Sequence, residues 1–492
     1  MSENIERFDW LVMIYLAGNN SLGEESVAAL TQIAEAKIED NIAVFAQLNT
    51  GIHDRTTLRI TKETTPEDIH KKLHKALVDR ANDKEYDVND ATHKARIHEF
   101  VKFCLQKRAK RHMLILSGHG GDMSNFLRED NPQAGTFSVA DFGALIKLID
   151  EVKLGGGGID ILGMDSCLMS MTEIAYMLHK HAEVMIGAEG FEPSAGWPYG
   201  KVLKLLNTIP DDNEKLAKAI VCEYINHYTI FQAANVSVDL AACRLGTSSD
   251  DLMQAVQSLC EPLQKSLEAY KQDGKTNADV RDAVLLSHWE AQLYKNEQYV
   301  DLYDFCTLLK SRLKGTHGEI VSGCQNVLNA IVGTENQRKV DGDSALELAH
   351  PHFQKVPGCV LKSCYSGWAV QYSYGVSIYF PWSETPTEMV EYEKFEFARE
   401  SRWADFLKTY LEVTKRKARG EEPQKQPPPS FSQSLLRTAF NVAPTAGFIQ
   451  GHRNADPNKN ADPNKSLTNL VGSMKNPATG FFPCECEPGL TD

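Results

Sequence analysis

The stretch ILGMDSCLMS, residues 161–170, joins a strand-like pattern to a helix-like pattern through a thiol. The apolar run that begins at Ile159 is typical of a buried strand, and it stops at Asp165-Ser166-Cys167. A helical pattern follows at once, with apolar residues at Met171, Ile174, Ala175 and Leu178. The sequence therefore predicts a strand that carries Cys167 to the edge of a sheet, at the start of a helix.

Other apolar runs share this strand-like composition, at residues 10–18, 42–49, 112–119 and 183–190. Amphipathic helical patterns separate them. Continuously apolar strands that alternate with helices are typical of a mostly parallel sheet covered on both faces. We therefore expect an α/β protein, a three-layer sandwich whose ligand crevice lies beyond the carboxyl ends of the strands.

The second half of the chain is more helical, and its composition changes again near its end. Strand candidates remain at residues 235–240, 368–374 and 376–382, and one helix is expected over 387–412. We expect a core over residues 1–234, a helical region over 235–415 that contributes late strands to the core, and a flexible tail over 416–492. In that tail NADPNK occurs twice, and such a Pro-, Asn- and Lys-rich segment buries too little apolar area to offset its ordering entropy.

Charge and hydropathy exclude several classes of partner. A net charge of −14 over 492 residues argues against nucleic acid. No run approaches the roughly 18 apolar residues of a membrane helix, and the acidic N-terminus MSENIERFDW lacks the pattern of a secretory signal. We expect a monomer that does not bind membranes and is cytoplasmic as the sequence stands; secretion stays open, because an export signal can be trimmed.

The cysteines do not form a recognisable framework. There are eleven, with no C-x-x-C pair, which favours neither a disulfide scaffold nor a zinc ribbon. Most lie in apolar helical patterns and are typical of small core residues. Cys484 and Cys486 are close enough to share a metal, but two thiols in a polar tail are weak evidence for a site.

Two strand ends carry the residues with chemistry. The run Leu114-Ile115-Leu116 leads into Ser117-Gly118-His119-Gly120-Gly121, and the run at 159–164 leads to Cys167. If both strands are parallel neighbours, His119 and Cys167 face one crevice, where the imidazole can take the thiol proton. The N–H groups of Gly120 and Cys167 are then placed to bind an oxyanion, an effect of about 3 kcal/mol for one donor. Alone, each residue is more often structural, but the pair favours catalysis.

These residues resemble the clostripain family of the caspase-like cysteine peptidases. The similarity is carried by LILSGHGG (114–121) and DSCLMSMTEIAYML (165–178). Supporting matches are VMIYLAGNNSL (12–22), GAEGFEPSAGWPYG (187–200), VDLYDF (300–305) and GVSIYFP (375–381). The resemblance implies a caspase-like sandwich, with 1–234 as its catalytic core.

The resemblance also implies a mechanism and a specificity. It implies a cysteine endopeptidase with a His–Cys dyad at His119 and Cys167, and cleavage of protein or peptide substrates after Arg or Lys. Asp165, two residues before the thiol, would line the S1 pocket, where a carboxylate selects a guanidinium; its alternative role is to cap the helix. Glu189 and Glu192 are further candidate substrate-binding acids, although Ala195 stands nearest to the place where relatives often have a second acid.

Relatives are often made as inactive precursors that are cut between the His and the Cys, and some need calcium. The corresponding segment is 122–139, which is polar and turn-rich, and Arg128 is its only basic residue. We therefore expect self-cleavage after Arg128. The chemistry requires no cofactor and no metal ligand set is predicted; calcium is possible near Asp122, Glu129 and Asp130, whose spacing matches no EF-hand.

Two other classes of function stay as alternatives. One is a catalytically silent scaffold that uses the same fold to bind protein partners, which the presence of both His119 and Cys167 disfavours. The other is a redox or metal-binding protein, which the scattered cysteine spacing disfavours.

Overall fold

The computed structural model describes residues 7–49, 56–73, 93–122, 125–128, 137–152, 158–295, 297–340, 357–383 and 386–414. The chain divides into two units, Met1–Arg419 and Gly420–Asp492. The predicted tail, 416–492, lies outside the described residues. In the described part of the chain, no helix is long and apolar enough to span a membrane.

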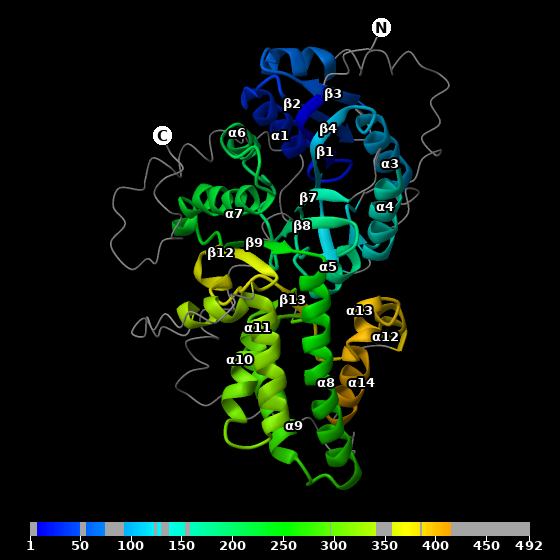
Figure 1. Ribbon diagram of the computed structural model, residues 1–492, viewed down its shortest axis with the longest axis vertical. Helices are drawn as coiled ribbons and strands as arrows, with labels where there is room; N and C mark the ends of the chain where they lie inside the picture. The colour runs from blue at the N-terminus through cyan, green and yellow to red at the C-terminus, as the bar shows by residue number, and fades with distance from the viewer. Residues whose placement is uncertain are drawn as a thin grey trace, which may run out of the picture. The chain divides into compact units, whose positions relative to one another are not determined.

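An eight-stranded sheet forms the centre of the first unit, in the order β12-β9-β8-β7-β4-β1-β2-β3 (Figure 1). Its strands are β1 (Arg7–Ala17), β2 (Ile42–Asn49), β3 (Thr56–Ile60), β4 (Arg108–Ser117), β7 (Ile159–Asp165), β8 (Ala182–Gly187), β9 (Val238–Arg244) and β12 (Val360–Ser366). The five strands from β8 to β2 are parallel neighbours, and the antiparallel pairs lie toward the two edges. The sheet is therefore mostly parallel, as predicted.

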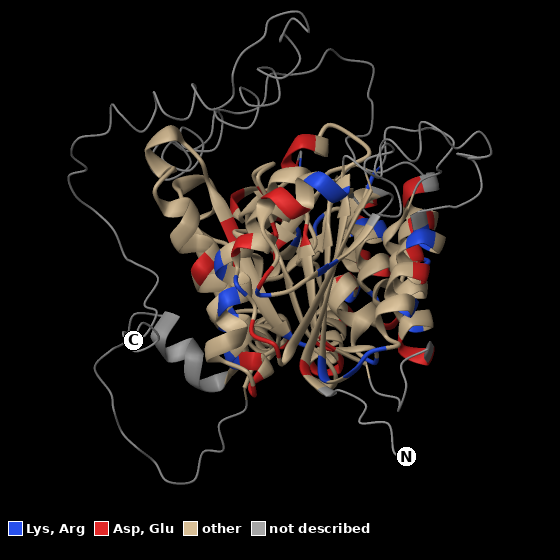
Figure 2. Cartoon of the chain, turned by 90° about the horizontal axis from the view of Figure 1, so that it is seen from above, with Lys and Arg blue, Asp and Glu red and all other residues tan. Residues whose placement is uncertain are grey.

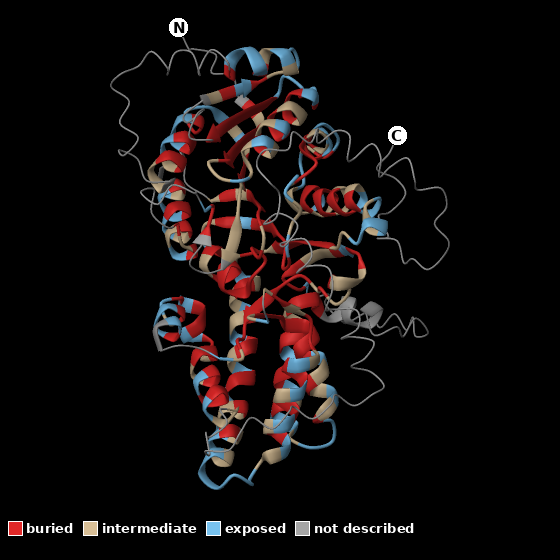
Figure 3. Ribbon diagram, turned by 180° about the vertical axis from the view of Figure 1, so that it is seen from behind, coloured by how far each residue is buried: buried red, intermediate tan, exposed pale blue. Residues whose placement is uncertain are grey.

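Helices cover both faces of this sheet, which explains why its strands are apolar on both sides. One layer contains α1 (Gly23–Glu35), α6 (Tyr199–Thr208) and α7 (Asn213–Thr229), and the other contains α3 (His93–Cys104), α4 (Val139–Val152) and α5 (Thr172–Leu178). Seen from above, the strands run between the two groups of helices (Figure 2). Buried residues fill the strands and the inner sides of the helices (Figure 3), which confirms the predicted three layers.

The second half of the unit is mainly helical. It contains α8 (Thr247–Asp273), α9 (Ala278–Glu290), α10 (Leu302–Arg312), α11 (Gly318–Val340), α12 (Pro386–Tyr392), α13 (Glu396–Glu400) and α14 (Trp403–Thr414). A small sheet, β10 (Leu293–Tyr294), β11 (Tyr299–Asp301) and β13 (Ser377–Tyr379), lies among them. The ring of Phe380, the residue after β13, packs edge to face against Trp403 and Tyr410 of α14. This region contributes β9 and β12 to the main sheet.

Two predicted elements of this half are wrong in detail. The strand expected over 368–374 is a short 3-10 turn at Trp368–Val370, because Gly367 has φ +95° and turns the chain directly after β12. The single helix expected over 387–412 is three helices, α12 to α14. Arg402, with φ +60°, separates the last two, because a left-handed residue cannot continue a right-handed helix.

Three adjacent strands end level with one another, and this positions the site. The register pairs Leu16 of β1 with Ser117 of β4, and Ser117 with Asp165 of β7. The segments that follow β1, β4 and β7 therefore leave the sheet side by side, at the edge where α/β proteins bind ligands.

Candidate active site

His119 and Cys167 occupy equivalent places on neighbouring strands. Each follows by two positions a member of the registered pair Ser117–Asp165. The two strand ends are joined beyond that pair, because Gly118 N donates to Asp165 O over 3.1 Å and Ser166 Oγ donates to Gly118 O over 2.8 Å. The structure therefore brings the LSGHGG and DSC segments together.

Gly120 lies against the main chain of Cys167. A Cβ atom at this position would lie 2.0 Å from the Cys167 carbonyl oxygen, far inside contact distance. Only glycine permits this approach, and it places the two predicted oxyanion-binding residues next to each other.

Cys167 lies in a turn rather than at a helix start. The next helix, α5, begins only at Thr172, so the prediction that a helix begins at Cys167 is wrong. The reason is Leu168, whose φ of +63° and N–H bond to Gly190 O turn the chain away from a helical path. The dipole of α5 therefore does not act on the thiol, since such effects fade beyond the first turn.

The Cys167 thiol is held in its neutral form at rest. Its sulfur accepts a hydrogen bond from Glu192 N over 3.2 Å. Burial raises the pKa of Cys167 to about 12, and the charges of Glu192 and Asp165 raise it as well, while the Glu192 N–H lowers it. A thiol in this state needs a base at the moment of reaction.

The turn that carries Cys167 is bonded to residues 205 positions further along the chain. Ser170 Oγ donates to Gly375 O over 2.6 Å, and Ser377 N donates to Ser170 O over 2.9 Å. Thr172 Oγ1 donates to Ser377 O over 2.8 Å. Residues beside β13 therefore fix the segment that carries Cys167.

His119 is contacted by a residue that the sequence did not single out. Its Nε2 lies 2.9 Å from the Oγ of Ser21, in the loop between β1 and α1. The His119 carbonyl accepts a hydrogen bond from Arg128 N over 3.4 Å, so the predicted self-cleavage residue lies beside the predicted base. The available signal for Ser21 was its position just after a strand at the same sheet edge.

Asp165 and Glu192 form an acidic pair next to Cys167. Asp165 is buried, and its Oδ2 accepts hydrogen bonds from Ser117 Oγ over 2.8 Å and Tyr199 OH over 2.7 Å. Burial raises the pKa of Glu192 well above its ordinary value, and the neighbouring Asp165 carboxylate raises it further. Both carboxylate oxygens of Glu192 are shielded from solvent and have no hydrogen bond of normal geometry within the described residues. In the described part of the chain, neither of these two acids forms an ion pair with a basic side chain.

The turn opposite Asp165 explains the position of Ala195. Gly196 has φ +65°, and a Cβ at this position would lie 2.7 Å from Asp165 Oδ2. Gly196 is also held through its carbonyl, which accepts a hydrogen bond from Tyr228 OH over 2.6 Å. Ala195 is exposed in this turn, so Glu192 is the loop acid that lies beside Asp165.

Glu189 lies in a second acidic cluster, together with Asp239 and Asp301. It is fully buried, and its Oε1 accepts a hydrogen bond from Gly375 N over 2.6 Å. Asp239 binds the N–H groups of Glu189 and Gly190, at 2.8 and 3.0 Å. Glu189 therefore lies in a cluster separate from the Asp165–Glu192 pair, and its predicted role in substrate binding stays a prediction.

Burial raises the pKa of all three carboxyls of this cluster, and neighbouring charges add to the shift at Glu189 and Asp301. Burial raises the pKa of Glu189 well above its ordinary value, and the charges of Asp301 and Asp239 raise it further. Burial likewise raises the pKa of Asp239 to about 6 and that of Asp301 to about 8. Glu189 therefore ionises less readily than an ordinary glutamate.

The calcium expectation stays a prediction. Glu129 and Asp130 lie outside the described residues. Within the described part of the chain, no group of three or more His, Cys, Asp or Glu side chains is arranged to hold a metal ion.

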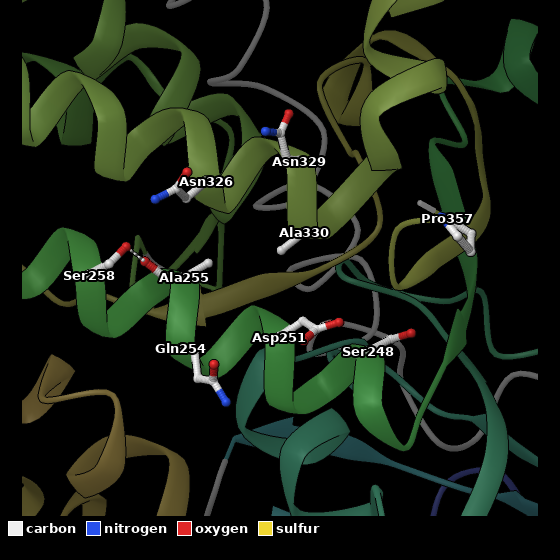
Figure 4. A pocket seen from close by; sticks show the side chains of 9 residues that line it. All are labelled: Ser248, Asp251, Gln254, Ala255, Ser258, Asn326, Asn329, Ala330 and Pro357. Carbon is white, nitrogen blue, oxygen red and sulfur yellow. Dashed lines mark hydrogen bonds between the residues drawn. The ribbon is translucent and has the colours of Figure 1, made fainter. Parts of the chain in front are cut away.

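A separate groove of about 480 Å³ lies between α8 and α11 (Figure 4). Its lining residues are Ser248, Asp251, Gln254, Ala255, Ser258, Asn326, Asn329, Ala330 and Pro357. None of the predicted site residues is among them, so this groove is distinct from the Cys167 site.

A half-buried thiol, a histidine on the neighbouring strand end and an acidic pair, all at the carboxyl edge of a mostly parallel sheet, are typical of a cysteine peptidase. The sequence pattern of the clostripain family, Peptidase_C11, matches residues 14–410. The chain belongs to the clostripain family and is a cysteine peptidase.

Solved structures are similar in fold. A secreted C11 cysteine protease from Bacteroides thetaiotaomicron, "iotapain", has 13% identity and a TM-score of 0.52, with 80% of this chain and 99% of that chain covered. The same description with an irreversible peptide inhibitor gives 14% identity, a TM-score of 0.48, and coverage of 80% and 99%. An inactive zymogen C11 protease from Parabacteroides distasonis gives 16% identity, a TM-score of 0.47, and coverage of 80% and 98%. No curated protein matches the chain in sequence.

Proposed function

We propose that this protein is an endopeptidase that cleaves after Arg or Lys with a dyad of His119 and Cys167. The observation that carries the proposal is the acidic pair beside the thiol. Glu192 donates its N–H to Cys167 Sγ, while its buried side-chain oxygens lie beside Asp165 without a hydrogen-bond partner of normal geometry in the described residues. A substrate cation between these acids would place its own carbonyl group near the sulfur.

The raised thiol pKa sets the order of events. Because Cys167 is neutral at rest, its proton moves to His119 as the sulfur attacks the substrate carbonyl carbon. The new C–S bond places negative charge on the carbonyl oxygen, which the N–H groups of Gly120 and Cys167 bind. His119 then gives the proton to the leaving amine, and a water molecule, deprotonated by His119, hydrolyses the thioester.

The basic preference follows from two carboxyls that share one site. In the empty pocket, burial and repulsion from Asp165 raise the pKa of Glu192 well above its ordinary value. An arginine guanidinium removes this repulsion, and its planar donors match two carboxylates better than the ammonium of lysine does. We therefore place Arg ahead of Lys in preference.

Self-cleavage after Arg128 belongs to the same proposal. Arg128 is exposed, and its main chain is held at the site from both sides. Its N–H donates to His119 O over 3.4 Å, and its carbonyl accepts a hydrogen bond from Asn20 Nδ2 over 2.6 Å. Arg128 is therefore held beside His119, the proposed base for cleavage of the peptide bond after Arg128.

The test is a scan of P1 residues with fluorogenic peptides, using the wild type, Asp165→Ala and Cys167→Ala. We expect turnover with Arg and Lys only, its loss in Cys167→Ala, and a selective loss of the basic substrates in Asp165→Ala. Repeating the assay in EDTA measures the contribution of calcium, to which we assign no step in the chemistry.

Two results would contradict the proposal. An absence of turnover for every P1 residue, together with iodoacetamide labelling of all thiols at equal rates, would favour a silent scaffold. Turnover without a preference for Arg or Lys would reject the role of Asp165 and Glu192 in substrate selection, while the His119–Cys167 dyad would still be supported.

A further inference from the structure

The loop between β8 and α6 presents an aromatic ring to solvent beside the nucleophile. Phe191 is 40% exposed in this loop. The residue before it, Gly190, is buried, and the side-chain oxygens of the residue after it, Glu192, are shielded from solvent. Single exposed apolar side chains are common on protein surfaces, so exposure alone assigns Phe191 no role.

The main chain on both sides of Phe191 is bonded to the turn that carries Cys167. Gly190 O accepts a hydrogen bond from Leu168 N over 3.0 Å. Glu192 N donates to Cys167 Sγ over 3.2 Å. Phe191 is the residue between these two bonds, so its main chain lies along the nucleophile turn, one residue from the contact with the sulfur.

The loop is also fixed from its other side. Gly190 N donates to Asp239 Oδ1 over 3.0 Å, and a Cβ at Gly190 would lie 2.7 Å from the same oxygen. After Phe191 the chain turns back, because Gly196 N donates to Pro193 O over 2.9 Å. A ring on a main chain that is held in this way can bind a substrate with little loss of conformational entropy.

The order of the strands indicates which half of a substrate passes Phe191. Strand β7 lies between β4 and β8, so Cys167 lies between the segment that carries His119 and the loop that carries Phe191. In the proposed mechanism His119 gives a proton to the leaving amine, which places the leaving half of the substrate on the β4 side. The acyl half, whose basic P1 residue is held by Asp165 and Glu192, then lies on the β8 side.

The side chains of Phe191 and Glu192 have opposite environments, one exposed and one shielded. Successive side chains of an extended substrate also point to opposite sides, so a P1 residue directed into the pocket leaves P2, the residue before it, directed outward. We propose that Phe191 forms an apolar wall for the P2 side chain, so that the enzyme prefers a large apolar residue there. This inference rests on the proposed function and adds a second determinant of substrate choice.

The chemistry of the ring decides which P2 residues fit. Contact with a leucine, valine or phenylalanine side chain removes apolar surface of both partners from water. A P2 aspartate would lose hydration against the ring without gaining a hydrogen bond. A P2 glycine makes no side-chain contact and gives the reference rate.

The experiment measures kcat/KM for peptides that end in Xaa-Arg-aminomethylcoumarin, with leucine, valine, phenylalanine, glycine or aspartate at P2. The coumarin replaces the leaving half of the substrate, so only contacts of the acyl half are measured. We expect the wild type to prefer leucine over glycine about tenfold, Phe191→Ala to reduce this ratio to about twofold, and Phe191→Leu to keep most of it. Turnover of the glycine peptide should change less than about twofold in both variants.

Phe103→Ala is the matched control. Phe103 is 48% exposed near the end of α3, which leads into the amino end of β4, whereas the site lies at the carboxyl end of that strand. This variant should keep the wild-type ratio of leucine to glycine.

Two results would overturn the inference and leave the proposed function in place. One is a wild type that selects Arg at P1 and shows no preference at P2. The other is a fall by the same factor for every P2 residue in Phe191→Ala, glycine included, because the ring would then act on the P1 residue or on the fold of the loop. A wild type that cleaves none of the peptides would overturn the proposed function, and this inference with it.

Discussion

Ser117 and Asp165 are a registered pair in β4 and β7, and the Ser117 hydroxyl donates to Asp165 Oδ2 over 2.8 Å. One strand therefore orients the acid that we place in the S1 pocket, while the residues two positions further on are the proposed base and nucleophile. Under the proposed function, binding and catalysis therefore depend on the same two strand ends.

Ser117→Ala tests this dependence on the binding side. Asp165 loses one of its two side-chain donors and keeps Tyr199, so its carboxylate is held less firmly. We expect KM for Arg substrates to rise about fivefold with kcat little changed, as one hydrogen bond contributes about 1 kcal/mol. Ser138→Ala, which removes a similar 2.8 Å bond to Asp141 at the start of α4, is the control. A loss of kcat alone would contradict the assignment.

Gly120→Ala tests the close approach of the two strand ends. The new Cβ would meet the Cys167 carbonyl oxygen at 2.0 Å, so one of the two segments must move. We expect kcat/KM to fall at least about 100-fold, since oxyanion donors act only in the correct geometry. Gly318→Ala, at a position where a Cβ meets nothing within 4 Å, should leave kcat/KM unchanged. Circular dichroism separates a local effect from unfolding.

Glu192→Gln tests the acidic pair through pH. In the wild type the pKa of Glu192 is raised, so the carboxylate forms, and binds a cation, only as pH rises through that value. The KM for Arg substrates should therefore fall with rising pH. In Glu192→Gln the KM should stay high and nearly independent of pH. A wild-type KM that is flat from pH 5 to 9 would exclude Glu192 from the pocket.

Glu189→Gln tests the buried acidic cluster. Carboxyls with raised pKa values stabilise the fold at low pH and lose that contribution as pH rises through the folded-state values, about 6 for Asp239 and about 8 for Asp301. Stability should therefore fall between about pH 4 and pH 8. Glutamine keeps the Oε1 acceptor for Gly375 and supplies a permanent donor toward Asp301.

We expect Glu189→Gln to match the wild type at pH 5 and to raise the melting temperature at pH 8. The groups that face Glu189 are Asp239, Asp301, Tyr294 and Cys243. Glu24→Gln, an exposed change on α1, should not alter the profile. A parallel fall of both profiles with pH would assign the alkaline loss to other groups.

Arg128→Gln tests self-cleavage. Removing the guanidinium removes the S1 anchor of this bond, so the purified chain should stay uncut. Intact-mass measurement of the wild type, Arg128→Gln and Cys167→Ala decides the point. We expect a cut chain only in the wild type; three identical intact masses would exclude self-cleavage.

Much of the fold was predictable because short apolar runs and amphipathic helical patterns in the sequence determine it. The apolar runs around Ile161 and Leu114 can be buried only in a sheet covered on both faces, and parallel pairing then brings their carboxyl ends together. That logic placed His119 and Cys167 on one edge without any knowledge of the contacts between them.

The missed features depend on contacts across long stretches of chain. Leu168 adopts φ +63° and delays α5 because its N–H bonds to Gly190 O, which no helical periodicity reveals. Ser21 reaches His119 across 98 positions. Glu189 and Glu192 stand in the same loop, and the sequence does not distinguish them. The structure does, because the side chain of Glu189 bonds to Gly375, 186 positions away. Contacts of this kind form only when the whole chain packs, so local sequence patterns do not reveal them.

The bonds from Ser170 and Thr172 to Gly375 and Ser377 also determine when, during synthesis, the turn around Cys167 can be completed. These partners are 205 positions further along the chain. On the ribosome, the turn that carries Cys167 emerges long before the residues that fix it. Ser170 and Thr172 therefore lack these partners until 205 further residues have been added, and the complete turn around Cys167 cannot form before then.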